Sequence, residues 1–507
     1  MISAASKRIQ ADHTIPPRFH ATIALNCSRE LARHRRRGAK TDRVMDHIPR
    51  SLLERPFRRL GRQSLVNRLH ALRALAEVRG MRYLDDAGQA RTIEIALKPW
   101  VLTSQQLLYF HGMAQQLADA LLRLVHLHAR LPNVRQIVPF DPVRASWLHL
   151  RAHPSSKPLA VIGRLDSTAI YDHAGWRTDF RMLEPNTVGV GGVHYSPTGC
   201  SISMDVVGDL LTEALPGRVL TAMPDPRRLL VEELRAVATR LRRPLRGIAL
   251  IENTEYTTGT DEFQELSAYL IRLGLKAVVA DPRELRIVRG QLYAGGTPVD
   301  FLYRDSELEE FVEMEARGTR LRALRHAIQE GRLISSLAWE FDQKSTWEIF
   351  TDAQYARYFT ASQRRLFREH LLWTRLVRQA TVSDPHGRSV DLVPFIRRQQ
   401  HRLALKPNAM FGGEGVILGP TVSQRTWEAH LGHALRGRER YVVQRLAHIP
   451  TDIFPLLDDG RAQWQSRCVV SGFFFSSSGI GLVGRFSSLP VVNVSRGGGL
   501  ISALWAH

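Results

Sequence analysis

The distribution of apolar and polar positions divides the chain into a mostly helical front part and a strand-rich end. Helical periodicity runs through residues 60–131 and again through residues 306–380. In the first range, five apolar side chains recur at steps of three and four residues: Phe110, Met113, Leu117, Leu121 and Leu124. This spacing predicts a helix with one buried face, and we expect these residues to pack in the core and to carry no chemistry.

Short apolar runs between turn residues predict strands elsewhere. Segments 247–256, 263–273 and 277–280 are expected to form one βαβ unit, which implies parallel strands with a right-handed crossover. A further strand is predicted at 158–162. Beyond residue 401, strands are predicted to alternate with turns at 402–405, 415–418, 440–444, 467–475, 480–486 and 490–494. The predicted class is therefore α+β with an α/β insert and a helical N-terminal region.

The composition is that of an ordinary globular protein. The 507 residues are enough for two or three packed units, and 44% of them are apolar. No uncharged apolar run approaches the roughly 20 residues that a membrane span needs, so we expect no membrane partner. The basic N-terminus lacks the apolar segment of a secretion signal. Cys27, Cys200 and Cys468 are far apart, which argues against a disulfide framework and predicts a cytoplasmic location.

Charge is unevenly distributed along the chain. Residues 1–44 carry ten basic and three acidic side chains with almost no apolar periodicity, so we expect a disordered tail and a globular part that opens at Met45, itself a candidate start. The net charge of +21 raises the question of nucleic-acid binding. However, the arginines are scattered singly or in pairs and no reader module is recognisable, so we expect no nucleic-acid partner. The oligomeric state is left open.

The first candidate site lies in residues 401–419. A short apolar strand carries Lys406, and a glycine cluster follows it: Gly412, Gly413 and Gly415. Glycine lets backbone N–H groups approach a bound anion, and a neighbouring lysine adds a mobile positive charge. This pattern indicates a site for a nucleoside triphosphate, although it is neither a Walker loop nor a Rossmann fingerprint. The alternative is a plain turn.

Lysine is scarce in this chain, which makes individual lysines informative. Of the 70 lysine and arginine residues only seven are lysines. Lys344, in the segment Phe-Asp-Gln-Lys-Ser-Thr, is therefore a second candidate contact for an anionic ligand.

The second candidate site lies in residues 163–186. Arg164 and Asp166 are two residues apart, and so are Glu184 and Asn186, so each pair shares one face of a strand. Carboxylate and amide oxygens are the ligands that magnesium prefers, and one or two carboxylates with substrate phosphates are enough. The pattern therefore predicts a magnesium site, the alternative being ordinary surface or turn residues.

Together these motifs resemble the ATP-grasp ligases. The resemblance rests on Arg-x-Asp, Glu-x-Asn, an isolated lysine, Leu-Lys-Pro with Gly-Gly-x-Gly, and a Val-Gln pair, and it runs from about residue 155 onward. More narrowly, the chain is similar to the circularly permuted branch that includes the synthetase domain of glutathionylspermidine synthetase. Glu184 and Asn186 precede Lys406 by over two hundred residues, whereas in unpermuted members the metal ligands follow the nucleotide clamp.

The resemblance implies a role for each matching residue. Magnesium ligands would be Asp166, Glu184 and Asn186, and Arg164 would stabilise the transferring phosphoryl group or the acyl phosphate. Contacts to ATP would come from Lys344, Lys406, the loop of Gly412, Gly413 and Gly415, and Gln444. Arg485 would contact phosphate, with a surface strand arginine as the alternative.

The resemblance also implies an activity and a division of the chain. The activity would be ATP- and magnesium-dependent joining of a small-molecule or peptide carboxylate to an amine through an acyl phosphate. The alternative is a degenerate ATP-binding scaffold without ligase activity. The expected parts are a tail (1–44), a helical region (45–150), a metal and substrate half (151–305), a helical segment with Lys344 (306–400) and a nucleotide-clamp half (401–507).

Overall fold

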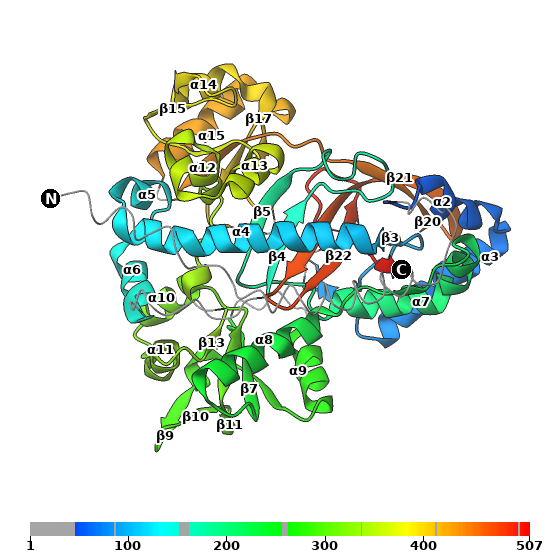
Figure 1. Cartoon of the computed structure of the whole chain (residues 1–507), viewed down its shortest axis with the longest axis horizontal. Helices are drawn as coiled ribbons and strands as arrows, with labels where there is room; N and C mark the ends of the chain where they lie inside the picture. The colour runs from blue at the N-terminus through cyan, green and yellow to red at the C-terminus, as the bar shows by residue number, and fades with distance from the viewer. Residues whose placement is uncertain are drawn as a thin grey trace.

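The computed structural model describes residues 46–85, 88–151, 162–255, 262–335, 337–410, 413–437, 439–494 and 497–507 (Figure 1). The predicted tail, Met45 and residues 158–161 of one predicted strand lie outside this part of the chain. A large central sheet lies between a parallel-sheet region and a smaller antiparallel region (Figure 1). Within the described ranges, no helix combines the length and the apolar composition needed to cross a bilayer.

The central sheet has six antiparallel strands in the order β23-β22-β21-β4-β5, and β20 pairs with β21 outside this path. The strands are β4 (Gly163–Ser167), β5 (Met182–Asn186), β20 (Thr451–Asp458), β21 (Arg461–Phe475), β22 (Ile480–Ser487) and β23 (Gly499–Ile501). Successive side chains of a strand point to opposite faces. Phe473 and Phe475 accordingly pack in one core and Phe474 in another, so both faces of the sheet are covered.

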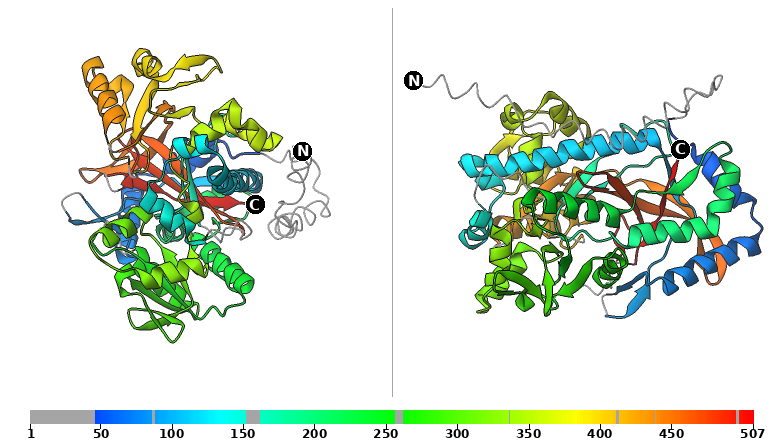
Figure 2. Two further views of the ribbon diagram at one scale, coloured as in Figure 1. Left: turned by 90° about the vertical axis from the view of Figure 1, so that its left-hand side faces the viewer. Right: turned by 60° about the horizontal axis from the view of Figure 1, so that its bottom comes forward.

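Helices cover the two faces of this sheet (Figure 2). On one face lies α4 (Ser104–Arg130), which begins at a capping box formed by Thr103 and Gln106. The five residues predicted to form its apolar face are all buried in the core with Phe473, so that prediction is confirmed. The core on the opposite face contains residues of further helices, among them α2 (Arg50–Arg59), α3 (Arg62–Val78) and α7 (Tyr195–Ala214).

The predicted helical stretch 60–131 is wrong in its middle, where strands separate α3 from α4. The break follows Gly80, which has a φ of 68° that disfavours other residues. The chain then forms β1 (Arg82–Leu84), β2 (Ala90–Thr92) and β3 (Trp100–Thr103). Strand β3 joins a small sheet with β24 (Ala503–Ala506) and β6 (Leu220–Ala222).

A second region is built on four parallel strands in the order β13-β12-β7-β8. The strands are β7 (Gly247–Ile251), β8 (Lys276–Ala280), β12 (Phe301–Arg304) and β13 (Leu333–Ile334). The predicted βαβ unit is confirmed as β7, α9 (Glu262–Arg272) and β8, although β7 ends at Ile251 rather than at residue 256. Other elements of this region are α8 (Pro226–Leu241), α10 (Leu308–Ala316), α11 (Arg322–Gln329), β9 (Arg286–Val288), β10 (Gln291–Ala294) and β11 (Thr297–Val299).

The third region is a four-stranded antiparallel sheet in the order β14-β19-β17-β18. Its strands are β14 (Thr374–Leu376), β17 (Leu403–Pro407), β18 (Ile417–Leu418) and β19 (Tyr441–Arg445). A separate core of its own, with Trp427 and Leu405, lies beneath two helices, α14 (Leu392–Arg398) and α15 (Gln424–Arg436). The other helices and strands of the described chain, not all of them in this region, are α5 (Pro132–Ile137), α6 (Pro142–Leu148), α12 (Thr346–Thr351), α13 (Ala361–His370), β15 (Thr381–Ser383) and β16 (Ser389–Asp391).

The predicted strands after residue 401 are mostly confirmed as β17, β18, β19, β21 and β22. The strand predicted at 490–494 is wrong, because none of residues 490–494 belongs to a strand and pairing resumes only at β23. Strand β20 was not predicted. It contains Pro455, which is tolerated in this sheet because β20 pairs on one side only, with β21.

A buried ion pair fixes β20 to the rest of the molecule. Lys98 Nζ lies 2.7 Å from Asp452 Oδ1 and 3.3 Å from Glu54 Oε1 of α2. The side chains of Lys98 and Asp452 are 3% and 0% exposed. Trp100 Nε1 donates a further bond to Asp452 at 3.4 Å. Because both charges are out of water, each depends on the other for its stability.

We expect the substitution Asp452→Asn to lower the free energy of unfolding by about 3 kcal/mol, because it leaves the buried Lys98 ammonium short of negative charge. Urea denaturation measures the change. Asp458→Asn, at the exposed end of the same strand, is the matched control and should change stability by less than about 0.5 kcal/mol. Equal effects of the two substitutions would contradict the role given to this ion pair.

Candidate functional site

Four predicted site residues lie together on one face of the central sheet. In the pairing of β4 with β5, Arg164 lies opposite Asn186, and Asp166 lies opposite Glu184. Side chains of directly opposed residues in an antiparallel pair are on the same face. The alternation predicted from the sequence is therefore confirmed for both pairs.

Asp166 lies between two guanidinium groups. Arg164 Nε donates to Asp166 Oδ1 at 2.8 Å, and Arg485 Nη2 of β22 lies 2.7 Å from Asp166 Oδ2. Burial alone would raise the pKa of this carboxyl, but the two arginines outweigh it and lower the pKa to about 2. Asp166 is therefore ionised at neutral pH, and its charge holds both arginines in place.

A glycine makes room for this ion pair. Gly472 of β21 lies opposite Asp166, in the middle of a strand where glycine is usually unfavourable. A Cβ at this position would lie 2.7 Å from Arg164 Cδ and 3.0 Å from Asp166 Oδ1. The absence of a side chain at Gly472 thus allows the pair to lie flat against the sheet.

Lys406 and Gln444 meet in the third region, on neighbouring strands β17 and β19. Lys406 Nζ donates to Gln444 Oε1 at 2.7 Å, and Gln444 Nε2 donates to Thr374 Oγ1 of β14 at 3.0 Å. Burial, with a smaller contribution from the charge of Lys344, lowers the pKa of Lys406 to about 8, although Glu184 acts in the opposite direction. Lys406 is thus a weakly hydrated cation within electrostatic reach of the central sheet.

Lys344 connects the two regions directly. Its Nζ lies 3.3 Å from Glu184 Oε2 on β5 and 2.5 Å from the main-chain oxygen of Met410, which follows β17. Residues separated by 160 positions in the sequence therefore form one ion pair between the central sheet and the third region. Lys344 immediately precedes Ser345, the N-cap of helix α12.

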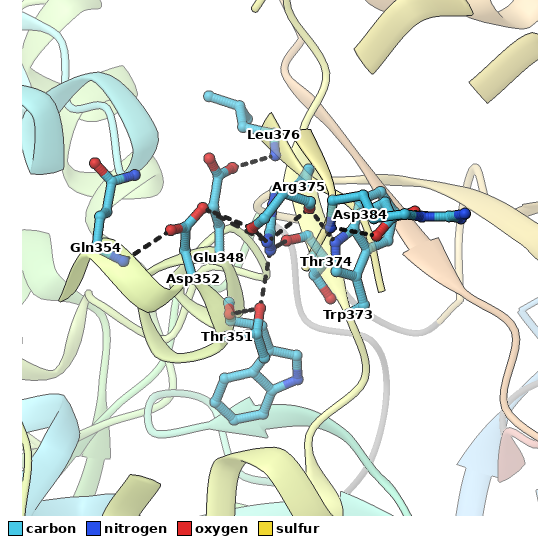
Figure 3. A network of polar contacts seen from close by, with 12 residues as sticks. Glu348, Thr351, Asp352, Gln354, Trp373, Thr374, Arg375, Leu376 and Asp384 are labelled. Carbon is cyan, nitrogen blue, oxygen red and sulfur yellow. Dashed lines mark hydrogen bonds and ion pairs between the residues drawn. The ribbon is translucent and has the colours of Figure 1, made fainter. Parts of the chain in front are cut away.

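A buried polar network anchors α12 to β14 (Figure 3). Glu348 of α12 is 1% exposed and accepts a bond from the backbone N–H of Leu376 at 2.7 Å. Arg375 Nη1 donates to Thr351 Oγ1 at the end of the same helix, at 2.9 Å. Helix α12 consequently has a fixed position relative to the strand that carries Thr374.

The described part of the glycine loop turns back towards β17. Gly413 and Gly415 have φ angles of 75° and 65°, which favour glycine at both positions, whereas Gly412 lies outside the described residues. A Cβ at Gly413 would lie 2.5 Å from Val491 Cγ1, and one at Gly415 would lie 2.7 Å from Pro407 Cγ. The loop thus packs closely against the segment that follows β22.

The end of β5 is held by a buried carboxylate. Asp342 Oδ2 accepts bonds from Thr187 N at 2.8 Å and Thr187 Oγ1 at 3.0 Å, directly after Asn186. Burial raises the pKa of Asp342 to about 7, and the nearby Glu340 adds to the rise. The segment from Asp342 to Lys344 therefore touches β5 at two points.

The charges of the site suit a polyanion bound with a divalent cation. Four cationic groups (Arg164, Arg485, Lys344 and Lys406) surround two carboxylates, Asp166 and Glu184. Within the described residues, Arg485 Nε is buried and has no hydrogen-bond partner, so it is a donor available to a ligand.

The residues present fit a magnesium ion only if a ligand supplies part of its coordination. No three histidine, cysteine, aspartate or glutamate side chains in the described ranges are arranged to hold a metal. Asp166 is also engaged by two arginines, which leaves Glu184 and Asn186 as the better placed oxygen donors. Magnesium bound through phosphates needs no more than this from the protein.

Several residues that hold the site were not predicted from the sequence. Gly472 carried a usable signal, because a glycine inside a strand often marks a close approach. Asp342 and Thr374 carried none, since a lone aspartate or threonine is common in any loop or strand. Their importance comes from contacts between distant parts of the chain.

No protein-family model matches this sequence, and no curated protein matches it significantly. Among solved structures, the chain is similar to a glutathione synthetase-like effector from Globodera pallida in its apo form. The TM-score is 0.58 at 11% identity, over 90% of this chain and 99% of that chain. The likeness is one of fold. A candidate gamma-glutamylcysteine synthetase from Methylobacillus flagellatus matches with a TM-score of 0.36 at 12% identity, over 75% of this chain and 85% of that one, which is too low to support an argument.

We expect Gly472→Ala to lower the free energy of unfolding by about 1–3 kcal/mol, because the new methyl group would displace Arg164 or Asp166. Thermal or urea denaturation measures the loss. The control is Gly112→Ala in α4, where a Cβ meets nothing within 4 Å and alanine should be neutral or stabilising. A Gly472→Ala protein as stable as the control would show that the ion pair does not need this space.

Proposed function

We propose that the protein is an ATP-dependent carboxylate–amine ligase that forms an amide bond through an acyl phosphate and requires magnesium. The proposed substrates are a small-molecule or peptide carboxylate and an amine. The proposed location is the cytoplasm, because the three cysteines are far apart in the sequence and do not form the pattern of a disulfide framework. The fold shared with a glutathione synthetase-like protein is compatible with this activity. A shared fold does not fix an activity, so the activity is proposed from the site residues.

The observation that carries the proposal is the contact between Lys344 and Glu184. It joins the candidate metal residues of the central sheet to the candidate nucleotide residues of the third region, with 3.3 Å between Nζ and Oε2. This contact supports the proposal that the two motifs, with their complementary chemistry, would form one site. Their order along the chain also supports our proposal of a circularly permuted ATP-grasp fold, because the metal motif comes first and still lies beside Lys406.

The chemistry requires activation of a carboxylate, which does not react with an amine on its own. Transfer of the γ-phosphoryl group of ATP to a carboxylate oxygen gives an acyl phosphate and ADP. The amine nitrogen then attacks the acyl carbon, the C–O bond to phosphate breaks, and amide, phosphate and a proton are released. Catalysis of this kind depends mainly on positioning and on neutralising phosphoryl charge.

Each residue would contribute in a defined way. Lys344 and Lys406 would bind the phosphates of ATP, and Gln444 would orient the Lys406 ammonium. Arg164 and Arg485, aligned by Asp166, would stabilise the phosphoryl group in transfer. Glu184 and Asn186 would hold magnesium, which would supply positive charge to offset that of the phosphates. The glycine loop, including Gly413 and Gly415, would cover the phosphates and exclude water.

We expect Glu184→Ala to abolish ADP formation while the protein stays folded, because it removes the partly buried carboxylate of the proposed magnesium site. The assay is ADP release in a screen of carboxylate–amine pairs with Mg-ATP. Glu213→Ala, at an exposed position of α7, is the control and should behave like the wild type.

Two outcomes would contradict the proposal. Unchanged turnover in Glu184→Ala would remove the metal assignment. A wild-type protein that binds Mg-ATP but releases no ADP with any pair would favour the alternative, a degenerate ATP-binding scaffold.

We expect Lys406→Arg to raise the KM for ATP about tenfold, because the larger planar guanidinium does not fit a place shaped by an ammonium. The pH dependence of KM for ATP provides a second test of the role of Lys406. Lys406 has a pKa of about 8, so its ammonium is present below that pH and is lost above it. KM for ATP in the wild type should therefore be level below pH 8 and rise above it.

The arginine variant serves as its own control for this pH effect, because arginine does not lose its proton in this range. KM for ATP measured from pH 6.5 to 9.5 should rise above pH 8 in the wild type and stay level in Lys406→Arg. The same inflection in both proteins would show that another group titrates.

A further inference from the structure

Asn408 lies two residues after Lys406, is 2% exposed, and uses all of its polar groups. Its side-chain Oδ1 accepts from Ser345 N at 2.8 Å, and its Nδ2 donates to Gln343 Oε1 at 2.9 Å. Its main-chain oxygen accepts from Lys344 N at 3.1 Å, and its N–H donates to Arg440 O at 2.7 Å. Asn408 therefore holds Gln343, Lys344 and Ser345 against the end of β17.

These contacts complete a closed frame of four elements around the two lysines. Helix α12 is joined to β17 through Asn408, and β17 is paired with β19. Strand β19 is paired with β14, where Gln444 also bonds Thr374. Strand β14 is joined to α12 by the hydrogen bond from Leu376 N to Glu348, which closes the frame (Figure 3). Each element is thus fixed to two neighbours.

The frame matters because Lys344 and Lys406 carry like charges. The charge of Lys344 already disfavours the protonated form of Lys406. Glu184, which pairs with Lys344 and favours the protonated form of Lys406, offsets part of this repulsion. Without the frame, a phosphate group would still have to bring the two ammonium groups into position on binding. Fixing them beforehand removes that cost from ligand binding.

We propose that Asn408 is a positioning residue that sets the location of Lys344 relative to Lys406 and so prepares the site for the phosphates of a nucleotide. The inference rests on the proposed function, since it concerns the same ligand. Asn408 itself need not touch the nucleotide. Its side chain acts through the backbone of residues 343–345.

The test is a double-mutant cycle on nucleotide affinity. The proteins are the wild type, Asn408→Ala, Lys344→Met and the double variant, and isothermal titration calorimetry measures the Kd for the magnesium complex of the β,γ-imido analogue of ATP. We expect Asn408→Ala to weaken binding about tenfold in the wild-type background. Because Asn408 acts through Lys344, it should have little further effect when Lys344 is already replaced.

Gln400→Ala is the matched control. Gln400 is also 2% exposed in the third region, and its side-chain amide makes two hydrogen bonds, to Gly419 O and Val422 O at 2.8 Å each. Its loss should lower thermal stability about as much as Asn408→Ala and leave the Kd unchanged. Should Asn408→Ala not fold, Gln343→Ala removes only the bond to Asn408 Nδ2 and should weaken binding in the same direction.

The outcomes separate this inference from the proposed function. A wild-type protein that does not bind the analogue overturns the proposed function. If the wild type binds but the effects of Asn408→Ala and Lys344→Met are additive, the positioning role is wrong while nucleotide binding stands. An equal loss of affinity in Gln400→Ala would also contradict the positioning role, because it would show that lower stability alone accounts for the weaker binding of Asn408→Ala.

Discussion

The buried charge of Asp166 is the constraint on which the site depends. A carboxylate in the middle of a packed sheet is stable only with close positive partners, and Arg164 and Arg485 supply them from two different strands. The pair in turn requires Gly472 on the strand between them, because any side chain there would occupy its space. Strands β4, β21 and β22 are thus matched to one another by a single ion-pair cluster, and Glu184 and Asn186 acquire their positions from the same register.

The segment from Asp342 to Ser345 connects the central sheet to the third region. Asp342 bonds the end of β5, Lys344 pairs with Glu184, and Ser345 bonds Asn408. A short piece of chain outside any long helix or strand therefore connects two sheets. The connection brings Lys344 of this segment and Lys406 of the third region into electrostatic contact with one carboxylate of the central sheet, that of Glu184.

The sequence predicted those features that depend on local pattern. Alternation placed Arg164 with Asp166 and Glu184 with Asn186, and helical spacing identified the buried face of α4. The prediction was less successful where long-range contacts decide the outcome. Strand β20 contains a proline that only an edge position tolerates. The helical stretch before α4 is broken by the local pair β1–β2 and by β3, whose partner β24 lies beyond residue 500. Asn408 and Thr374 gain their roles from neighbours that local sequence does not reveal.

The pairing of strands far apart in the sequence has a consequence for how the molecule folds. Ser167 pairs with Ser471 in the central sheet, and Trp100 pairs with Ala503 in the small sheet of β3, β24 and β6, so both sheets form only when segments some 300 to 400 residues apart meet. During synthesis, β4 and β5 leave the ribosome long before β21 and β22 exist to cover their edges. Such a high contact order makes folding slow and leaves an unpaired apolar edge exposed meanwhile. Folding of this protein in the cell is accordingly expected to depend on chaperones that protect the first half of the chain until the second half is complete.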